Sequence, residues 1–414
     1  MSVNYLNINK LFYFSLIFGV VIWFCVFVTL PVQIVEPIQP KTTLFIVACY
    51  LSLIFGFVTI NLKKKEKEVY NQVELISILY KIIIITALSF LVRFIDLFFV
   101  REMTLSNSYA LNRSLVGSGF EFVQIPFKIA SVLKALYFFP IVIVISLNLQ
   151  NKRLKILSFA LLFLPLIEAL LLGSRKPFFD IAIILVFSIL VFTKIKLTKN
   201  KIILTLFGAI SLFIVTNLLL FKREAKEGKN IYNEILSARY NDLLKPSKNI
   251  ELYILSDSTS DLNKRTALTF LHLGQYITHG FFEFNHIVKG KPIPLTYGSY
   301  TFSPFGRLFN KGNINTSPRE YVYITTFGAL FLDFGWLTPL FMFVFGGFQK
   351  IVFLNAKNNF IWLPLVIYII IINVFLLMFN YLRGAGIYPF VAFTIILLLL
   401  KNNLIKVNEE SISS

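Results

Sequence analysis

The chain contains about ten apolar stretches that are long enough to cross a lipid bilayer, and no other feature limits its fold as strongly. A helix needs about 18 or more apolar residues to span the hydrocarbon layer. The expected helices cover residues 11–30, 43–62, 76–100, 127–149, 156–173, 177–193, 202–221, 325–348, 360–379 and 387–400. The sequence therefore predicts an all-α polytopic membrane protein with about ten transmembrane helices.

The composition agrees with a membrane location. Of the 414 residues, 57% are apolar and only 15% are charged, whereas a soluble domain carries about 25% charged residues. The net charge of +19 does not indicate nucleic-acid binding, because the basic residues lie in short clusters between apolar stretches. Cys25 and Cys49 both lie inside apolar stretches, so we interpret them as small buried residues rather than as part of a metal or redox motif.

Lysine and arginine in short connections indicate the orientation of the predicted helices, because they are retained on the cytoplasmic side. The basic connections are residues 63–67, 151–155, 194–201, 350–357 and 401–406. They all fall on one side of the membrane together with both chain termini, and we assign that side to the cytoplasm. The outward connections are then residues 31–42, 101–126, 174–176, 222–324 and 380–386.

One long polar segment interrupts the apolar pattern. Residues 222–324 carry charges, glycines, prolines and all three histidines, and the orientation makes them one large extracytoplasmic (periplasmic) loop. We expect residues 1–221 to form transmembrane helices 1 to 7. Residues 325–414 would form helices 8 to 10 and a cytoplasmic tail.

Charged residues inside the predicted helices share one depth. Ionisable side chains are costly in a bilayer and mark either a function or a specific partner. Those in the outer half of their helices are Arg93, Asp96, Lys128, Lys134, Glu168, Asp180 and Asp333. Taken one at a time, each of these residues is explained as an interface residue or as half of a buried pair. Arg93 and Asp96 have the spacing to pair with each other. Their shared depth also predicts a polar cavity that opens outward beneath the long loop.

Two short outward turns carry arginines. In Gly173-Ser174-Arg175-Lys176-Pro177, glycine permits a tight turn and proline suits the first turn of the next helix. Arg175 would then lie beside a helix N-terminus, which suits a phosphate, although contact with lipid headgroups is the alternative. The stretch from Asn380 to Gly386 places Arg383 outward between the last two helices in the same way.

The long loop adds further cationic and aromatic side chains. Its arginines include Arg223, Arg239, Arg265, Arg307 and Arg319. Arginine binds phosphate oxygens in pairs and aromatic rings cover sugar faces, so the outward side fits a lipid-linked pyrophosphate that carries sugars. His272, His279 and His286 are spaced by seven residues, which is about 10.5 Å on a helix and too far for a shared metal. We expect no metal site, and a polar helix face or a sugar contact instead.

Several stretches resemble the O-antigen polymerase family, the oligosaccharide repeat-unit polymerases of the Wzy type. They are Leu171 to Arg175, Gly274 to Thr278, Thr296 to Phe302, and Tyr321 to Gly328 followed by Asp333-Phe334-Gly335. The resemblance implies an integral-membrane glycosyltransferase of the GT-C type that uses no metal or other cofactor. Such an enzyme would polymerise lipid-linked repeat units into O-antigen of lipopolysaccharide, or into capsule, at the bacterial cytoplasmic (inner) membrane.

The resemblance also implies partners. The donor and the acceptor would both be glycans linked to undecaprenyl pyrophosphate, within the lipid bilayer. A chain-length regulator and a flippase are further expected partners, and nucleic acid is not.

Site roles follow from the chemistry that the resemblance implies. Arginines would stabilise the negative charge that develops on the departing pyrophosphate. For this role we select Arg175, Arg319 and Arg383 first, and then Arg223, Arg239 and Arg307. A carboxylate or histidine would accept the proton of the attacking hydroxyl. The candidates, in order, are Glu320, Asp333, Glu224 and His279, and Glu320 has a second interpretation as the ion-pair partner of Arg319.

Two other functions remain open on the sequence. An O-antigen ligase, or another lipid-linked-sugar glycosyltransferase, would carry a similar long outer loop. A lipid-linked oligosaccharide flippase or transporter would show inverted repeats, broken helices in mid-membrane and polar residues at several depths. The chain has no internal repeat, and its charges within the helices favour one side.

Overall fold

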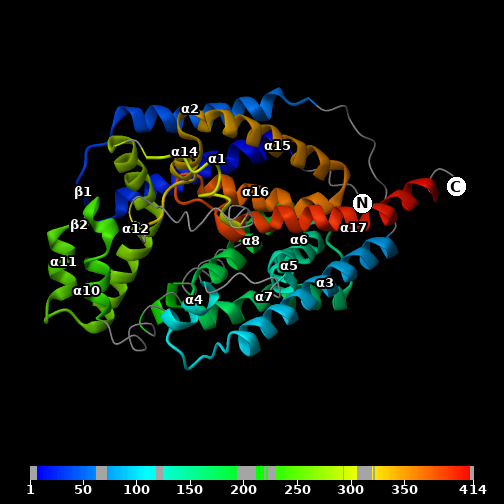
Figure 1. The fold of residues 1–414 in the computed structure, drawn as a ribbon, viewed down its shortest axis with the longest axis horizontal. Helices are drawn as coiled ribbons and strands as arrows, with labels where there is room; N and C mark the ends of the chain where they lie inside the picture. Colours follow the sequence, from blue (N-terminus) through cyan, green and yellow to red (C-terminus); the bar gives the residue numbers. More distant parts are fainter. Residues whose placement is uncertain are drawn as a thin grey trace.

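The computed structural model describes residues 7–61, 72–117, 125–193, 230–291, 293–304, 319 and 322–410, and a few single residues between 211 and 221. Within these ranges the chain is almost entirely helical, with two short strands. Figure 1 shows the helices packed as one elongated bundle, with α10, α11 and α12 at one end. The predicted all-α class is confirmed for the described residues.

Six described helical segments are long and apolar enough to span a membrane. They are α1 (Ile8–Thr29), α2 (Pro40–Thr59), α3 with η1 (Gln72–Ile95, Asp96–Val100), α5 with η3 and α6 (Ile125–Leu133, Lys134–Phe138, Phe139–Ser146), α7 (Lys152–Leu172), and α14 with η5 and α15 (Thr326–Phe334, Gly335–Leu337, Thr338–Asn358). Shorter apolar stretches are η6 with α16 (Phe360–Trp362, Leu363–Phe375) and the part Gly384–Leu399 of η7 with α17 (Gly384–Ile387, Tyr388–Glu410). Helix α8 (Lys176–Phe192) has 17 residues. The chain is thus a multi-pass membrane protein.

The structure corrects two of the predictions, and a third lies mostly outside the described residues. Most of the predicted helix 202–221 lies outside the described residues. The predicted helix 325–348 is broken at Gly335, whose φ of 57° is a left-handed conformation that ends α14 before Thr338 and Pro339 start α15. Cys49 is buried as expected, but Cys25 is exposed because it lies on the outer face of α1.

Helices α2 and α15 pack through glycines. A Cβ atom added to Gly56 would lie 1.8 Å from the carbonyl oxygen of Phe343, and one added to Gly346 would lie 2.0 Å from that of Leu53. Only glycine permits such an approach, and small residues at helix contacts are the usual means of close packing in membranes. The aromatic contacts Phe45–Phe331 and Phe57–Phe353 lie on either side of this crossing.

A buried amide pair joins three helices in the centre of the bundle. Asn373 of α16 and Gln349 of α15 exchange two hydrogen bonds of 2.8 and 2.9 Å, and Asn373 also donates to Ser15 of α1 at 3.0 Å. All three side chains are fully buried. We expect Asn373→Leu to lower the free energy of unfolding by about 1 kcal/mol, because the Gln349 amide would lose its partner in an apolar setting. Unfolding in mixed detergent measures this, and an unchanged midpoint would contradict it.

The predicted outward connections meet at one end of the bundle, which we call the outer end. Strand β1 (Val32–Ile34) pairs antiparallel with β2 (Leu244–Pro246), with Val32 opposite Pro246 and Ile34 opposite Leu244. Further links are Gln39 N–H to Asn285 Oδ1 (2.8 Å), Asn112 Nδ2–H to the Leu171 carbonyl (2.8 Å) and Asn380 N–H to the Ile324 carbonyl (3.2 Å). Hence residues far apart in the chain form one surface there.

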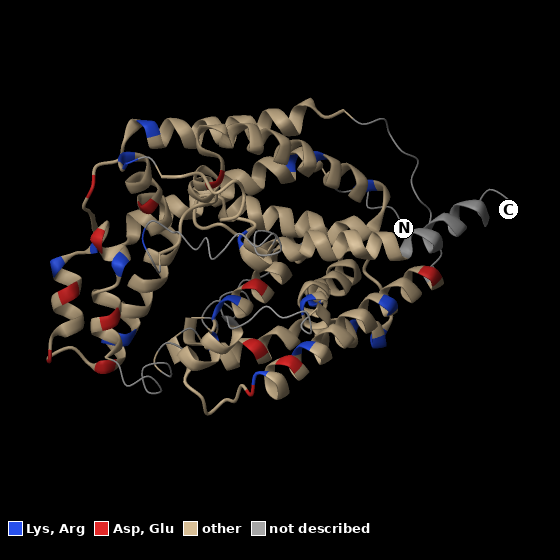
Figure 2. Cartoon of the chain, viewed as in Figure 1, with Lys and Arg blue, Asp and Glu red and all other residues tan. Residues whose placement is uncertain are grey.

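The described part of the polar segment up to Lys289 is mostly helical. It contains α10 (Ile231–Leu236), η4 (Arg239–Asp242), α11 (Lys248–Leu255) and the 29-residue helix α12 (Asp261–Lys289). A smaller helix, α4 (Tyr109–Gly117), lies against the end of α7. Figure 2 shows charged residues gathered on α10 to α12, while α2 and α16 are nearly free of charge along their length.

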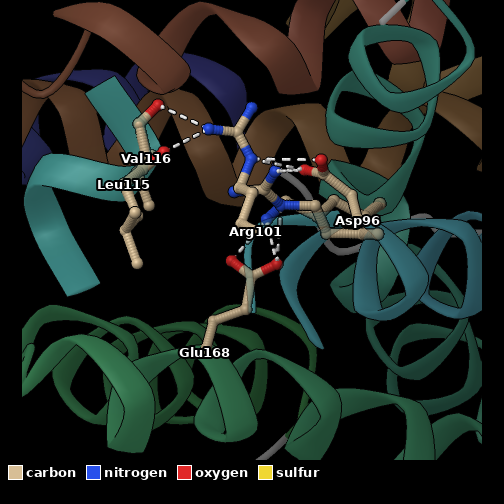
Figure 3. A network of polar contacts seen from close by, with 7 residues as sticks. Asp96, Arg101, Leu115, Val116 and Glu168 are labelled. Atoms are coloured by element: carbon tan, nitrogen blue, oxygen red, sulfur yellow. Dashed lines mark hydrogen bonds and ion pairs between the residues drawn. The ribbon is translucent and has the colours of Figure 1, made fainter. Parts of the chain in front are cut away.

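Four of the charged residues inside the predicted helices, Arg93, Asp96, Lys134 and Glu168, form a paired network with Arg101. Arg93 donates to Asp96 and lies 3.4 Å from Glu168, and Lys134 donates to Glu168 at 2.6 Å. Arg101 donates to Asp96 at 3.0 Å and also to the carbonyls of Leu115 and Val116, as Figure 3 shows. The predicted Arg93–Asp96 pair is confirmed. For these residues the structure therefore favours the paired interpretation over the outward cavity.

Candidate functional site

Helix α12 forms the core of the outer end and carries all three histidines. Its N-cap is Ser260, whose hydroxyl accepts from the Asn263 amide. Residues spaced by three, four or seven positions share a face of a helix. On this helix the face that carries His272, Gln275, His279 and Glu283 is buried against other outer segments.

Arg175 is held by a chain of hydrogen bonds, which we call the relay, that runs through His272 of α12 to Tyr240. Its guanidinium donates to His272 Nε2 at 2.9 Å, and His272 Nδ1 lies 2.8 Å from the hydroxyl of Tyr240. Because an arginine only donates, His272 Nε2 must accept, and the ring hydrogen is then on Nδ1 and points to the Tyr240 oxygen. The Tyr276 ring also lies 6.0 Å from the Arg175 guanidinium. The relay fixes a cation at the outer end.

The turn that carries Arg175 has the predicted local structure. Gly173 ends α7 in a left-handed conformation with φ 59°, and α8 begins at Lys176 with Pro177 in its first turn. A side chain at position 173 would also clash with the Tyr109 ring, 2.7 Å from an added Cβ. Arg175 is the N-cap residue of α8, so its backbone lies at the positive end of that helix.

A second arginine turn is tied to the first. Lys176 donates to Asp180 at 2.7 Å and lies 4.3 Å from the Tyr381 ring centre, while the Tyr381 hydroxyl donates to Asp180. Two residues later, Arg383 lies over the Tyr300 ring at 4.1 Å. The structure thus brings the Arg175 and Arg383 turns together through Lys176, Asp180 and Tyr381, and the predicted pyrophosphate-binding role of the two arginines stays a prediction.

Arg319 lies elsewhere on the same end and is engaged by acidic groups. Its guanidinium donates to Asp242 at 2.8 Å and to the Arg239 carbonyl, and its Nε lies 3.6 Å from Glu283 Oε2. Arg239 therefore contributes its backbone to Arg319. The predicted pyrophosphate-binding role of these two arginines stays a prediction.

Two predicted proton acceptors have their polar atoms occupied. Both carboxylate oxygens of Asp333 accept hydrogen bonds, from the amides of Tyr300 and Thr301 at 2.9 Å and from Thr296, so the residue holds loop 296–302. His279 Nδ1 donates to the Gln275 carbonyl at 2.7 Å, and its Nε2 accepts from the Tyr323 amide at 3.2 Å. Burial lowers the pKa of His279 to about 4, which keeps the ring neutral.

Four predicted site residues lie outside the described residues. They are Glu320, Glu224, Arg223 and Arg307. Their predicted roles therefore stay predictions.

Glu283 is a functional candidate that the sequence analysis missed. Its side chain is buried, its Oε1 has no hydrogen-bond partner among the described residues, and its pKa is raised to about 7. Burial is the main cause, Arg319 opposes it, and Asp242 and Glu36 add to it. A signal existed in the sequence, because Glu283 follows His279 by four residues within the apolar run Phe281-Phe282-Glu283-Phe284. No sequence signal links Tyr240 to His272.

His286, the third histidine, links the end of α12 to the connection formed by residues 31–42. His286 Nδ1 lies 3.0 Å from Glu36 Oε1, and Lys289 lies 3.4 Å from Glu36 Oε2. Burial opposes ionisation of Glu36, but these two partners outweigh it and lower its pKa. Among the described residues, no group of three or more histidine, cysteine or acidic side chains is placed to hold a metal ion.

Comparisons of the chain with protein-family models, with curated proteins and with solved structures gave no match.

Proposed function

We propose that this protein polymerises oligosaccharide repeat units linked to polyprenyl pyrophosphate, on the outer side of the bacterial cytoplasmic membrane. One observation carries the proposal: the turns with Arg175 and Arg383 meet on one surface through Lys176, Asp180 and Tyr381. Three cations and one carboxylate leave that surface positive, and it adjoins the ends of apolar helices. A ligand with a charged phosphate head and an apolar tail matches both properties.

The side chains around these cations suit sugars as well. Tyr276, Tyr300 and Tyr381 each present a ring to one of the basic groups. Aromatic rings cover the apolar faces of sugars, and their hydroxyl groups contribute hydrogen bonds. Tyr300 and Tyr381 are buried and position the cations, whereas Tyr276 is partly exposed and would cover the first sugar of a lipid-linked glycan.

In the proposed reaction, a hydroxyl of the acceptor sugar attacks the anomeric carbon of the donor glycan. The bond from that carbon to the pyrophosphate oxygen breaks, and the polyprenyl pyrophosphate leaves with the electron pair. Negative charge grows on the leaving oxygen as the bond breaks, so fixed cations stabilise the transition state more than the ground state. The relay through His272 and Tyr240 keeps Arg175 in place before the substrate arrives.

The test is reconstitution of the purified protein in liposomes with lipid-linked repeat units as the sole glycan. We expect a ladder of products that differ by one repeat unit. A ligase would leave the repeat units unextended and would act only when a lipid A core acceptor is added. A flippase would move them across the bilayer without change in length. Either result would overturn the proposal.

A further inference from the structure

We propose that Glu283 accepts the proton of the attacking sugar hydroxyl, and that Arg319 moves away from Glu283 when the lipid-linked pyrophosphate binds. This inference rests on the proposed function and names the proton acceptor that the transfer requires. It also assigns to Arg319 a role that links substrate binding to the chemistry.

Glu283 has an acceptor oxygen that the fold leaves without a partner. The residue is 2% exposed, and its Oε1 makes no hydrogen bond to any residue that the structure describes. Burial of an unsatisfied carboxylate oxygen is costly, and such an atom in a native structure calls for a reason. A donor supplied by a ligand satisfies it, and the donors that a glycan offers are hydroxyl groups. The missing partner therefore matches the acceptor substrate.

Two other outer carboxylates have both of their oxygens occupied by hydrogen bonds. Asp333 accepts from two backbone amides and Thr296, and Asp180 accepts from Lys176 and Tyr381. Glu36 Oε2 also lacks a hydrogen-bond partner among the described residues, but this carboxylate forms ion pairs with His286 (3.0 Å) and Lys289 (3.4 Å). These groups have a structural reason for their position, whereas Glu283 has, within the described part of the chain, only the longer contact to Arg319 (3.6 Å).

Arg319 lies between the buried carboxylate and a surface one. Its side chain is 16% exposed, and it joins Glu283 (3.6 Å) to Asp242 (2.8 Å), whose side chain is 68% exposed. A pyrophosphate carries more charge than either carboxylate and binds guanidinium groups in pairs of hydrogen bonds. It would therefore compete for Arg319 and draw it away from Glu283.

The surroundings of Glu283 give its carboxyl group a pKa that suits a general base near neutral pH. Its pKa is raised to about 7, mainly through burial, with Asp242 and Glu36 acting in the same direction and Arg319 against them. The nearby His279 contributes no charge because burial holds it neutral. Among the described groups that act on this pKa, only Arg319 favours the carboxylate. Its withdrawal raises the proton affinity of Glu283, so a carboxylate that is ionised in the free enzyme becomes a stronger base when the donor is in place.

The proton balance of the step is complete. The O–H bond of the acceptor sugar breaks as its oxygen bonds to the anomeric carbon, and the proton passes to Glu283 Oε1. The bond to the pyrophosphate oxygen breaks, and the leaving group keeps the electron pair. Glu283 then releases the proton to water as the product leaves. No metal or redox partner takes part in this sequence.

The experiment compares Glu283→Gln with the wild type in the liposome assay. Glutamine has the size of glutamate and cannot accept the proton, so we expect kcat to fall about 100- to 10,000-fold. The KM for the lipid-linked repeat unit should change by less than about threefold, because the lost interaction belongs to the transition state. Glu36→Gln, which removes another carboxyl packed on α12, is the matched control and should elongate at nearly the wild-type rate.

A pH profile distinguishes a catalytic role from a structural one. We expect kcat/KM of the wild type to rise with pH through a midpoint near 7, because only the carboxylate accepts a proton. The residual activity of Glu283→Gln should lack that rise. A wild-type profile without it would overturn the inference even if the variant fails to fold, and so would normal elongation by the variant.

Failure of the inference is distinct from failure of the proposed function. If the wild type elongates and Glu283→Gln does so equally, only the role of Glu283 is excluded. If the wild type forms no ladder, the proposed function itself is excluded.

Discussion

Arg175→Ala is expected to lower the rate of elongation by about 100- to 1,000-fold, the loss that follows removal of one fixed donor to a developing negative charge. The guanidinium is held in advance by His272 and lies near the Tyr276 ring, so no other side chain replaces it at that position. The measurement is the product ladder from reconstituted protein at equal amounts of inserted enzyme.

Three variants make the expectation specific. Arg175→Lys keeps the charge but loses the planar pair of donors, and we expect it to recover only part of the rate. Arg383→Ala should resemble Arg175→Ala, because Arg383 lies on the neighbouring turn over the Tyr300 ring. Arg153→Ala is the matched control, since Arg153 is exposed near the opposite end of α7 and should have no effect. Normal ladders from both Arg175→Ala and Arg383→Ala would remove the anion site.

Much of the architecture could be predicted from the sequence because its causes are local. A long apolar run must form its backbone hydrogen bonds within itself in a bilayer, so hydropathy alone locates the helices. The Gly173 turn and Pro177 were likewise predictable, because each depends on the conformational range of one residue. The break at Gly335 was missed, since a glycine within an apolar run does not by itself show whether the helix continues.

The site was less predictable because its contacts join distant parts of the chain. Arg175 meets His272 across 97 residues, and Tyr240 meets His272 across 32. The apolar pattern of a helix predicts which of its residues face inward, but it does not predict which residue each of them contacts. Asp333 shows the same difficulty. A carboxylate at a helix end is equally suited to catalysis and to holding a loop, and only its three hydrogen bonds reveal that it holds residues 296–302.

Loss of Asp96 is expected to have the largest effect on stability. The network of Arg93, Arg101, Lys134, Asp96 and Glu168 has three cations and two carboxylates, a net charge of +1. Asp96→Asn raises that charge to +2 and leaves both arginines without their shared partner. Removal of one member of a buried ion pair costs about 3–5 kcal/mol, because the remaining charge stays desolvated. Unfolding in mixed detergent should show this loss, and Lys81→Gln, a change at an exposed site on the same helix, should not.

A double-mutant cycle separates charge balance from packing in this network. Arg101→Gln alone brings the net charge from +1 to 0, and Asp96→Asn with Arg101→Gln returns it to +1. If charge balance stabilises the network, the double variant should be more stable than the sum of the two single losses predicts, by about 1–3 kcal/mol. Additive losses would instead mean that each side chain acts through its own packing and through the carbonyls of Leu115 and Val116. In that case the shared depth of the charges would need another explanation than mutual pairing, and the outward polar cavity would again be the stronger interpretation.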